Sequence, residues 1–145
     1  MNLQHIQDRL ALKDLVDTFS NLADEKKVAE QMPLFTEDAR VTTYIGGELF
    51  ADMTGRTKIE QVFSNFLANF HTVYHLNGQH TVTFADENRA DAINYCLVKL
   101  VENKDGKNIV HTHSVRYQDS YQKHNGNWLI SRRIANFMVS EQAEM

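Results

Sequence analysis

The sequence contains few of the residues that interrupt regular structure or cross-link a chain. Its 145 residues include one cysteine, one proline and six glycines. A lone cysteine, Cys96, cannot form an internal disulfide, so the cysteine content gives no indication of an oxidising compartment. The scarcity of proline and glycine predicts long helices and strands with few breaks.

The chain also lacks a cluster of basic residues and a long apolar run. Lys and Arg total 15 and Asp and Glu total 19, for a formal net charge of −4, so binding to a nucleic-acid backbone is not expected. The N-terminus has no signal-peptide core. The longest stretch without a charged residue, 61–85, is rich in Asn, Gln, His, Ser and Thr and cannot span a bilayer. We therefore expect a cytoplasmic protein that binds neither nucleic acid nor a membrane.

The remaining composition is that of an ordinary globular domain. Hydrophobic residues make up 42% and charged residues 23% of the chain, which excludes an intrinsically disordered protein. The length suits one domain, and no repeat or linker divides the sequence. We expect a single domain over residues 1–145.

Hydrophobic periodicity predicts two main helices. One covers residues 3–23, and its apolar stripe runs from Leu12 to Ala23. The other has a stripe from Ile59 to Phe70 and is preceded by a possible capping box, Thr57 to Glu60. A shorter helix between them should end near Pro33, because the residue before a proline avoids the helical region.

The second half of the sequence predicts strands. Long alternating runs cover 90–102, 108–123 and 128–139, and turns are expected at residues 36–38 and 77–78. Gly46-Gly47 predicts an additional hairpin. Helices followed by antiparallel strands indicate an α+β fold, in which a strongly curved sheet wraps around the N-terminal helices as a half-open conical barrel.

The run 108–123 separates into two faces. One face is uniformly small or polar beyond Val110, as suits solvent or a polar subunit contact. The other combines apolar bulk with polar groups, as in the wall of a small-molecule pocket. Its members are Ile109, His111, His113, Val115, Tyr117, Asp119 and Tyr121.

Several short motifs recur in a recognisable order. They are Phe35-x-x-Asp38-Ala39-x-Val41, Gly55-Arg56 with Ile59, His75-x-Asn77, residues 117–121 (YQDSY), residues 125–130 (NGNWLI) and Arg132-Arg133. Together they resemble SnoaL-like domains of the nuclear transport factor 2-like superfamily, over residues 10–134. The resemblance implies a conical α+β barrel and a function among dehydratases, isomerases, cyclases, dioxygenase small subunits or non-catalytic binding domains.

Within that family the chain is most similar to the branch of scytalone dehydratase and bile-acid 7α-dehydratase. The resemblance implies that Asp24, at the end of the first helix, and His75, before the long strands, form the catalytic pair. The chain departs from the branch at other positions. Phe19 stands in place of a tyrosine, Asn136 in place of an arginine, and the strand around Cys96 lacks a further acid or histidine.

Elementary chemistry supports a role for such a pair. A carboxylate that hydrogen-bonds one imidazole nitrogen fixes the tautomer and raises the basicity of the other nitrogen. Asp24 and His75 could then move a proton next to a carbonyl without a metal or cofactor, while Tyr44, His113 and Tyr117 orient a small-molecule ligand. The hypothesis is a lyase or isomerase acting on a small, partly apolar carbonyl compound.

Other interpretations remain open at this point. Asp24 can be a solvated residue at a helix end, His75 an ordinary strand histidine, and the domain a non-catalytic binding or association module. His111-x-His113, or His71 with His75, could contribute to a metal site, although paired histidines alone are a weak pattern. We expect a homodimer or homotrimer, because the outer face of the sheet and residues 137–139 offer apolar surface.

Overall fold

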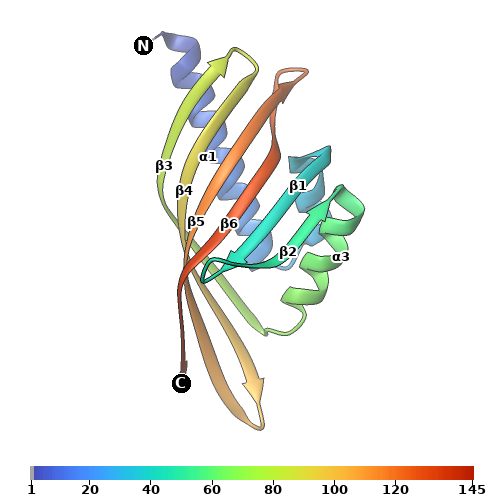
Figure 1. Ribbon diagram of the computed structural model, residues 1–145, viewed down its shortest axis with the longest axis vertical. Coiled ribbons are helices and arrows are strands. Elements are labelled where there is room, and N and C mark those ends of the chain that lie inside the picture. Colours follow the sequence, from blue (N-terminus) through green and yellow to red (C-terminus); the bar gives the residue numbers. More distant parts are fainter. Residues whose placement is uncertain (1) are drawn as a thin grey trace.

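The computed structural model describes residues 2–145, which form a helical layer and one six-stranded sheet (Figure 1). The helical segments are α1 (Leu3–Asp24), α2 (Val28–Gln31), η1 (Met32–Leu34) and α3 (Arg56–Leu67). The strands are β1 (Phe35–Ile45), β2 (Glu48–Thr54), β3 (Thr72–Asp86), β4 (Arg89–Lys104), β5 (Lys107–His124) and β6 (Asn127–Glu144). The predicted α+β class is confirmed.

The sheet is open and strongly curved. Its strand order is β2-β1-β6-β5-β4-β3, so β2 and β3 form the edges. All neighbouring strands are antiparallel except β1 and β6, which makes the sheet mixed rather than purely antiparallel. Register shifts insert extra residues into β2, β3 and β6 and bend these strands, since a bulge increases local twist. The sheet curves around α1, while α3 covers β1 and β2, as the predicted half-open cone requires (Figure 1).

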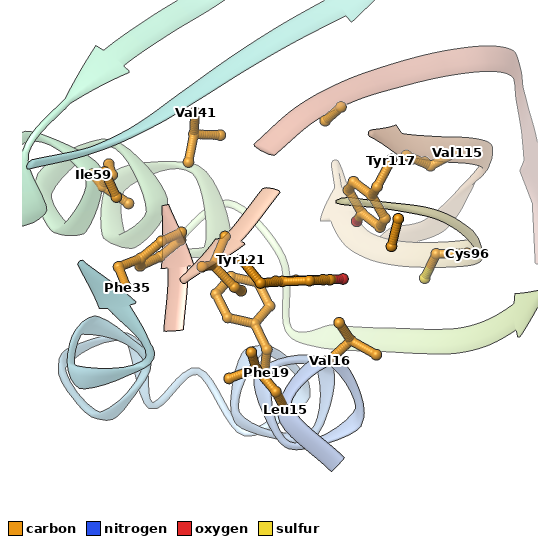
Figure 2. Close-up of a cluster of buried hydrophobic side chains, with 14 of the residues drawn as sticks. Leu15, Val16, Phe19, Phe35, Val41, Ile59, Cys96, Val115, Tyr117 and Tyr121 are labelled. Carbon is orange, nitrogen blue, oxygen red and sulfur yellow. The ribbon is translucent and has the colours of Figure 1, made fainter. Parts of the chain in front are cut away.

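The core lies between α1 and the concave face of the sheet. Strand alternation places Ala92, Asn94, Cys96 and Val98 of β4 in the interior, while Ile93, Tyr95 and Leu97 between them are exposed or only partly buried. Figure 2 shows Leu15, Val16 and Phe19 of α1 pointing toward side chains of the sheet, Tyr121 among them. Phe19 also packs edge-on against Phe35, with ring centroids 5.4 Å apart. The predicted apolar stripe of the first helix is therefore the face that closes the cone.

A buried carboxylate fastens the N-terminal part of α1 to the β5–β6 hairpin. Asp8 is 4% exposed and accepts hydrogen bonds from Trp128 Nε1 at 3.0 Å, Lys123 Nζ at 3.1 Å and Gln4 Nε2 at 3.2 Å. Burial opposes ionisation, but these three donors outweigh it and lower the pKa of Asp8. The carboxylate thus joins segments more than a hundred residues apart in the chain.

The turn predicted at residues 36–38 is wrong. These residues belong to β1, which begins at Phe35. Phe35 is completely buried and pairs with Ile130 of β6, and pairing with β6 resumes at Arg40 after a register shift, so the polar sequence that suggested a turn forms an irregular part of the strand.

The turn predicted at residues 77–78 is also wrong. Both residues lie inside β3, where the register shifts between Asn77 and His80. The side-chain amide of Asn77 donates to the carbonyl of Val16 at 3.2 Å and to Asp17 Oδ1 at 3.0 Å. The residue that suggested a turn instead ties an irregular strand to α1.

The capping box predicted for the second main helix does not form. The helix begins at Arg56, so Thr57 lies inside its first turn. The N-cap position is occupied by Gly55, which has no side chain to cap the helix. Gly55 has a φ of +89°, a conformation that favours glycine. The Arg56 guanidinium instead donates to the carbonyl oxygen of Phe35. The helix also ends at Leu67, earlier than its apolar stripe suggested.

The hairpin predicted at Gly46-Gly47 is confirmed, since the two glycines have φ values of +58° and +83° between β1 and β2. Across residues 2–145, no helix combines the length and apolar character needed to cross a membrane.

The Asp8 attachment predicts a pH-dependent loss of stability. Asp8→Ala should lower the free energy of unfolding at pH 7 by about 2–3 kcal/mol, because it removes hydrogen bonds to a charged group and leaves the Trp128 N–H unsatisfied. The folded-state pKa of Asp8 is lowered, so its ionised form stabilises the fold above the unfolded-state pKa of about 4, and this contribution disappears as the pH falls through the folded-state value. The deficit of the variant should therefore shrink in acid.

Urea unfolding of both proteins between neutral and acidic pH measures this effect. Asp14→Ala, on the exposed side of the same helix, is the matched control and should change stability by less than about 0.5 kcal/mol. An Asp8→Ala deficit that is equally large at every pH would contradict the role given to the charge.

Candidate functional site

The interior of the cone contains a cavity of about 200 Å³ between α1, α3 and the concave face of the sheet. Most of its wall is aliphatic or aromatic, with Phe19, Phe63, Leu67, Val98, Leu100 and Phe137 as representative members. Six of the lining residues have polar side chains: Gln31, Thr43, His75, His113, Tyr117 and Arg133. An apolar cavity with a few polar groups is the usual form of a small-molecule site.

Asp24 and His75 meet at the edge of this cavity. Asp24 is the last residue of α1, and its Oδ1 lies 2.7 Å from His75 Nδ1. The backbone N–H of His75 donates to Asp24 Oδ2 at 3.2 Å, so one carboxylate holds both the β3 backbone and the imidazole ring of His75. The side chain of His75 is 13% exposed and that of Asp24 is 27% exposed. His75 lines the cavity, whereas Asp24 lies behind it.

This geometry defines the protonation pattern of the neutral imidazole. An ionised carboxylate can only accept hydrogen bonds, so Nδ1 of His75 must carry the proton that faces Asp24. The other nitrogen, Nε2, then has a free lone pair. A lone pair held in this way on a cavity-lining residue can accept a proton from a bound molecule.

Arg133 places a positive charge in the same cavity. It is 3% exposed, and its Nε and Nη2 donate to the two oxygens of Asp119 at 2.8 and 2.9 Å. The guanidinium carbon also lies 3.9 Å from the ring centroid of Tyr117 and 4.9 Å from that of Phe19. Burial opposes the charge, but Asp119 outweighs burial and raises the pKa of Arg133. Nη1 donates to no residue in the described range 2–145.

The sequence alone indicates no functional role for Arg133, because an arginine in a strand is ordinarily expected at the surface. A signal was present in the alternation of β5. Asp119 lies on the inward face of that strand, and an inward carboxylate needs a buried cation as partner. Asp119 and Arg133 are directly opposite each other in the β5–β6 register.

Two of the predicted ligand-binding residues line the cavity. Tyr117 is buried, and burial raises the pKa of its hydroxyl, so it stays neutral and can donate a hydrogen bond. His113 packs against Phe137 with ring centroids 5.0 Å apart, and its Nδ1 lies 2.8 Å from Ser140 Oγ. Burial, with a smaller contribution from His111, lowers the pKa of His113 and favours its neutral form.

The position predicted for Tyr44 is corrected by the structure. Thr43 and Ile45 line the cavity and Tyr44 does not, because successive side chains of β1 point to opposite faces. Tyr44 therefore lies on the outer face of the sheet. An aromatic residue near a hairpin gives no indication of which face it occupies.

The remaining histidines that suggested a metal have other partners. His111 Nε2 lies 2.5 Å from Glu102 Oε2, and His71 Nε2 lies 3.0 Å from Asn108 Oδ1. His111 and His113 stack with ring centroids 6.5 Å apart. Within residues 2–145, no group of three His, Cys, Asp or Glu side chains is arranged to hold a metal ion.

Sequence comparison relates nearly the whole chain to one family. The model of a family described as SnoaL-like domain matches residues 4–134. Uncharacterized protein Rv2910c of Mycobacterium tuberculosis is 27% identical over 135 residues, which cover 92% of this chain and 88% of that protein.

Solved structures show the same fold. A Novosphingobium aromaticivorans protein provisionally named a scytalone dehydratase has a TM-score of 0.85 at 20% identity, covering 97% of this chain and 91% of its own. A hexachlorocyclohexane dehydrochlorinase, LinA type 2, has a TM-score of 0.82 at 16% identity, with coverages of 99% and 93%. An NTF2-like protein with a cystatin-like fold, also from N. aromaticivorans, has a TM-score of 0.73 at 21% identity, with coverages of 94% and 85%.

Because the Arg133–Asp119 pair is buried, removal of Asp119 should destabilise the fold far more than removal of an exposed carboxylate of the same sheet. Asp119→Ala should lower the free energy of unfolding by about 3–5 kcal/mol, because the Arg133 charge stays buried without its partner. The matched control is Asp52→Ala, which removes the carboxylate from an exposed pair with Arg40 at 2.7 Å. It should cause a much smaller change, since solvent screens exposed pairs. Equal losses in urea unfolding experiments would contradict this assignment.

Proposed function

The chain belongs to the SnoaL-like domain family, and from that premise we propose that it is a cofactor-independent lyase or isomerase. In this proposal it transfers a proton, as a dehydratase does, on a small, partly apolar carbonyl compound. The observation that carries the proposal is the 2.7 Å contact between Asp24 Oδ1 and His75 Nδ1 at the cavity wall. It leaves an imidazole lone pair available to the cavity.

His75 is the proposed general base. Its Nε2 removes a proton from the carbon next to the carbonyl group, and Asp24 stabilises the imidazolium that forms. Asp24 also fixes the ring, because it binds both Nδ1 and the backbone N–H of the same residue. A base held by packing and two hydrogen bonds loses little orientation when a ligand binds.

Arg133 and Tyr117 are the proposed stabilisers of the negative charge that develops on the substrate oxygen. Nη1 of Arg133 has no hydrogen-bond acceptor in residues 2–145, and burial keeps the hydroxyl of Tyr117 neutral. Fixed donors in a mostly apolar cavity stabilise a developing oxyanion more than water does. Arg133 thus takes the place of Tyr44, which was expected to orient the ligand but lies on the outer face.

The cavity wall supports a substrate with an apolar body. Aromatic side chains of α1 and α3, including Phe19 and Phe63, line the same cavity as His75. Two structural neighbours, one provisionally named a scytalone dehydratase and the other a hexachlorocyclohexane dehydrochlorinase, have names that denote loss of water and loss of hydrogen chloride. Loss of water or of hydrogen chloride requires removal of a proton, which is the chemistry proposed for His75.

A non-catalytic binding module is the second candidate. Cys96 occupies the strand in which the resemblance led us to expect a further acid or histidine. Burial raises the pKa of its thiol to about 11, so Cys96 is neutral and cannot take over that role. In this alternative, the same cavity holds a ligand without transforming it.

Assembly into a homodimer or homotrimer through the outer face of the sheet remains a prediction. Tyr95 and Leu97 of β4 are 39% and 36% exposed on that face, and Met138 of β6 is 59% exposed. Light scattering at micromolar concentration should give a mass of two or three chains. A monomeric mass would contradict it.

The proposed reaction predicts hydrogen–deuterium exchange at an activated carbon. Wild-type protein in heavy water should accelerate exchange of the protons beside the carbonyl of 2-tetralone, a compact bicyclic ketone, as measured by NMR. His75→Ala and Asp24→Asn should each lower the rate by about 10² or more, because one removes the base and the other its orienting carboxylate.

The matched control is His124→Gln, which alters an exposed histidine of the β5–β6 turn region and should leave exchange unchanged. Exchange that persists at the wild-type rate in both site variants would exclude the Asp24–His75 mechanism. Binding of 2-tetralone by the wild-type protein without accelerated exchange would support the binding module instead.

A further inference from the structure

Gln31 presents a buried hydrogen-bonding atom that the proposed reaction does not use. It is the last residue of α2, is 1% exposed and lines the cavity. Its Nε2 donates to the backbone carbonyl of Phe19 at 3.0 Å. Its Oε1 is buried and has no hydrogen-bond partner among residues 2–145.

The orientation of the Gln31 amide is fixed by its neighbour. Rotation of the amide by half a turn would place Oε1 against the Phe19 carbonyl oxygen, and two acceptors repel each other. The group without a partner is therefore the acceptor, not the donor. Buried polar atoms are nearly always paired, so an unpaired one beside a cavity indicates a partner that arrives with a ligand.

We propose that Gln31 Oε1 accepts a hydrogen bond from a hydroxyl or N–H group of the ligand and so determines specificity. A ligand without such a group leaves the acceptor unpaired in a water-poor site, whereas a ligand with it satisfies the acceptor. Sites of this kind discriminate strongly against analogues that lack the donor. The proposal deepens the proposed function, since it concerns the same cavity.

The fold also indicates where the hydroxyl or N–H group of the ligand lies relative to its reacting carbon. Gln31 is bound to Phe19, and His75 is bound to Asp24, five residues further along the same helix. Five residues of α-helix span about 7.5 Å along the axis. The favoured substrate is therefore a compact, largely apolar carbonyl compound that carries a hydroxyl or N–H group remote from the carbon attacked by His75.

A comparison of two ligands of nearly equal shape tests the proposal. Phenol carries a hydroxyl where toluene carries a methyl group. In NMR titrations, Gln31→Leu should weaken phenol binding relative to toluene binding by about tenfold, which corresponds to the loss of one hydrogen bond. Met53→Leu, at an apolar position of the same wall, is the control and should change both affinities by the same factor.

A crystal structure of the wild-type protein soaked with phenol gives an independent measurement that needs no variant. The phenol oxygen should lie within hydrogen-bond distance of Gln31 Oε1. An oxygen located elsewhere, no detectable phenol binding at millimolar concentration, or an unchanged affinity ratio in Gln31→Leu would each overturn the proposal. The binding and crystallographic measurements involve no proton transfer, so their outcome is independent of the exchange experiment on His75.

Discussion

The buried ion pair between Arg133 and Asp119 is the constraint on which the interior of the cone depends. Two charges can stay in an apolar interior only when geometry and additional hydrogen bonds offset their desolvation. Asp119 meets that condition by accepting from Arg133 twice and from the Tyr121 hydroxyl at 2.8 Å, and Tyr121 in turn contacts His80 of β3 at 3.1 Å. The network joins β3, β5 and β6, and a slip of one residue between β5 and β6 would separate the charges. The inner wall of the cavity is thus fixed by electrostatics as well as by apolar packing.

Helix α1 contributes Phe19 and Asp24 to the site, and Asp24 is in a position that the helix itself disfavours. Asp24 lies at the C-terminal end of the helix, where the helix dipole disfavours a negative charge by about 0.3–1 kcal/mol. Its two contacts with His75 provide the compensation. Violations of local preference that are satisfied by one specific partner are typical of functional positions. Phe19, five residues earlier, packs under Arg133, and its carbonyl accepts the hydrogen bond of Gln31, so a single rigid element aligns the base, the cation and the acceptor.

The sequence predicted the features that depend on hydrophobic periodicity but not those that depend on contacts between residues distant in the chain. The stripe from Leu12 to Ala23 and the inward face of β5 followed from burial, which repeats along an element. The meeting of Asp24 with His75 could be expected only from the resemblance to a family, because 51 residues separate them in the chain. Arg133 was overlooked since burial of its charge depends on Asp119 in another strand. The side of β1 occupied by Tyr44 and the unpaired oxygen of Gln31 depend on register and on a neighbouring helix, which local sequence does not specify.

The ionisation states of the cavity wall restrict how a proton taken up by His75 can be returned. Four lining residues titrate, and the other three are poor acids at neutral pH. The pKa of His113 is lowered, which favours its neutral form, a poor acid, while the pKa values of Tyr117 and Arg133 are raised, which makes their protons hard to remove. In the proposed mechanism His75 must therefore be both the base and the acid. One imidazole reaches only one face of a bound ring, so proton removal and delivery must occur on that same face. Loss of a hydroxyl group that takes its proton from His75 would be syn, and isomerisation would move the proton along a single face of the substrate.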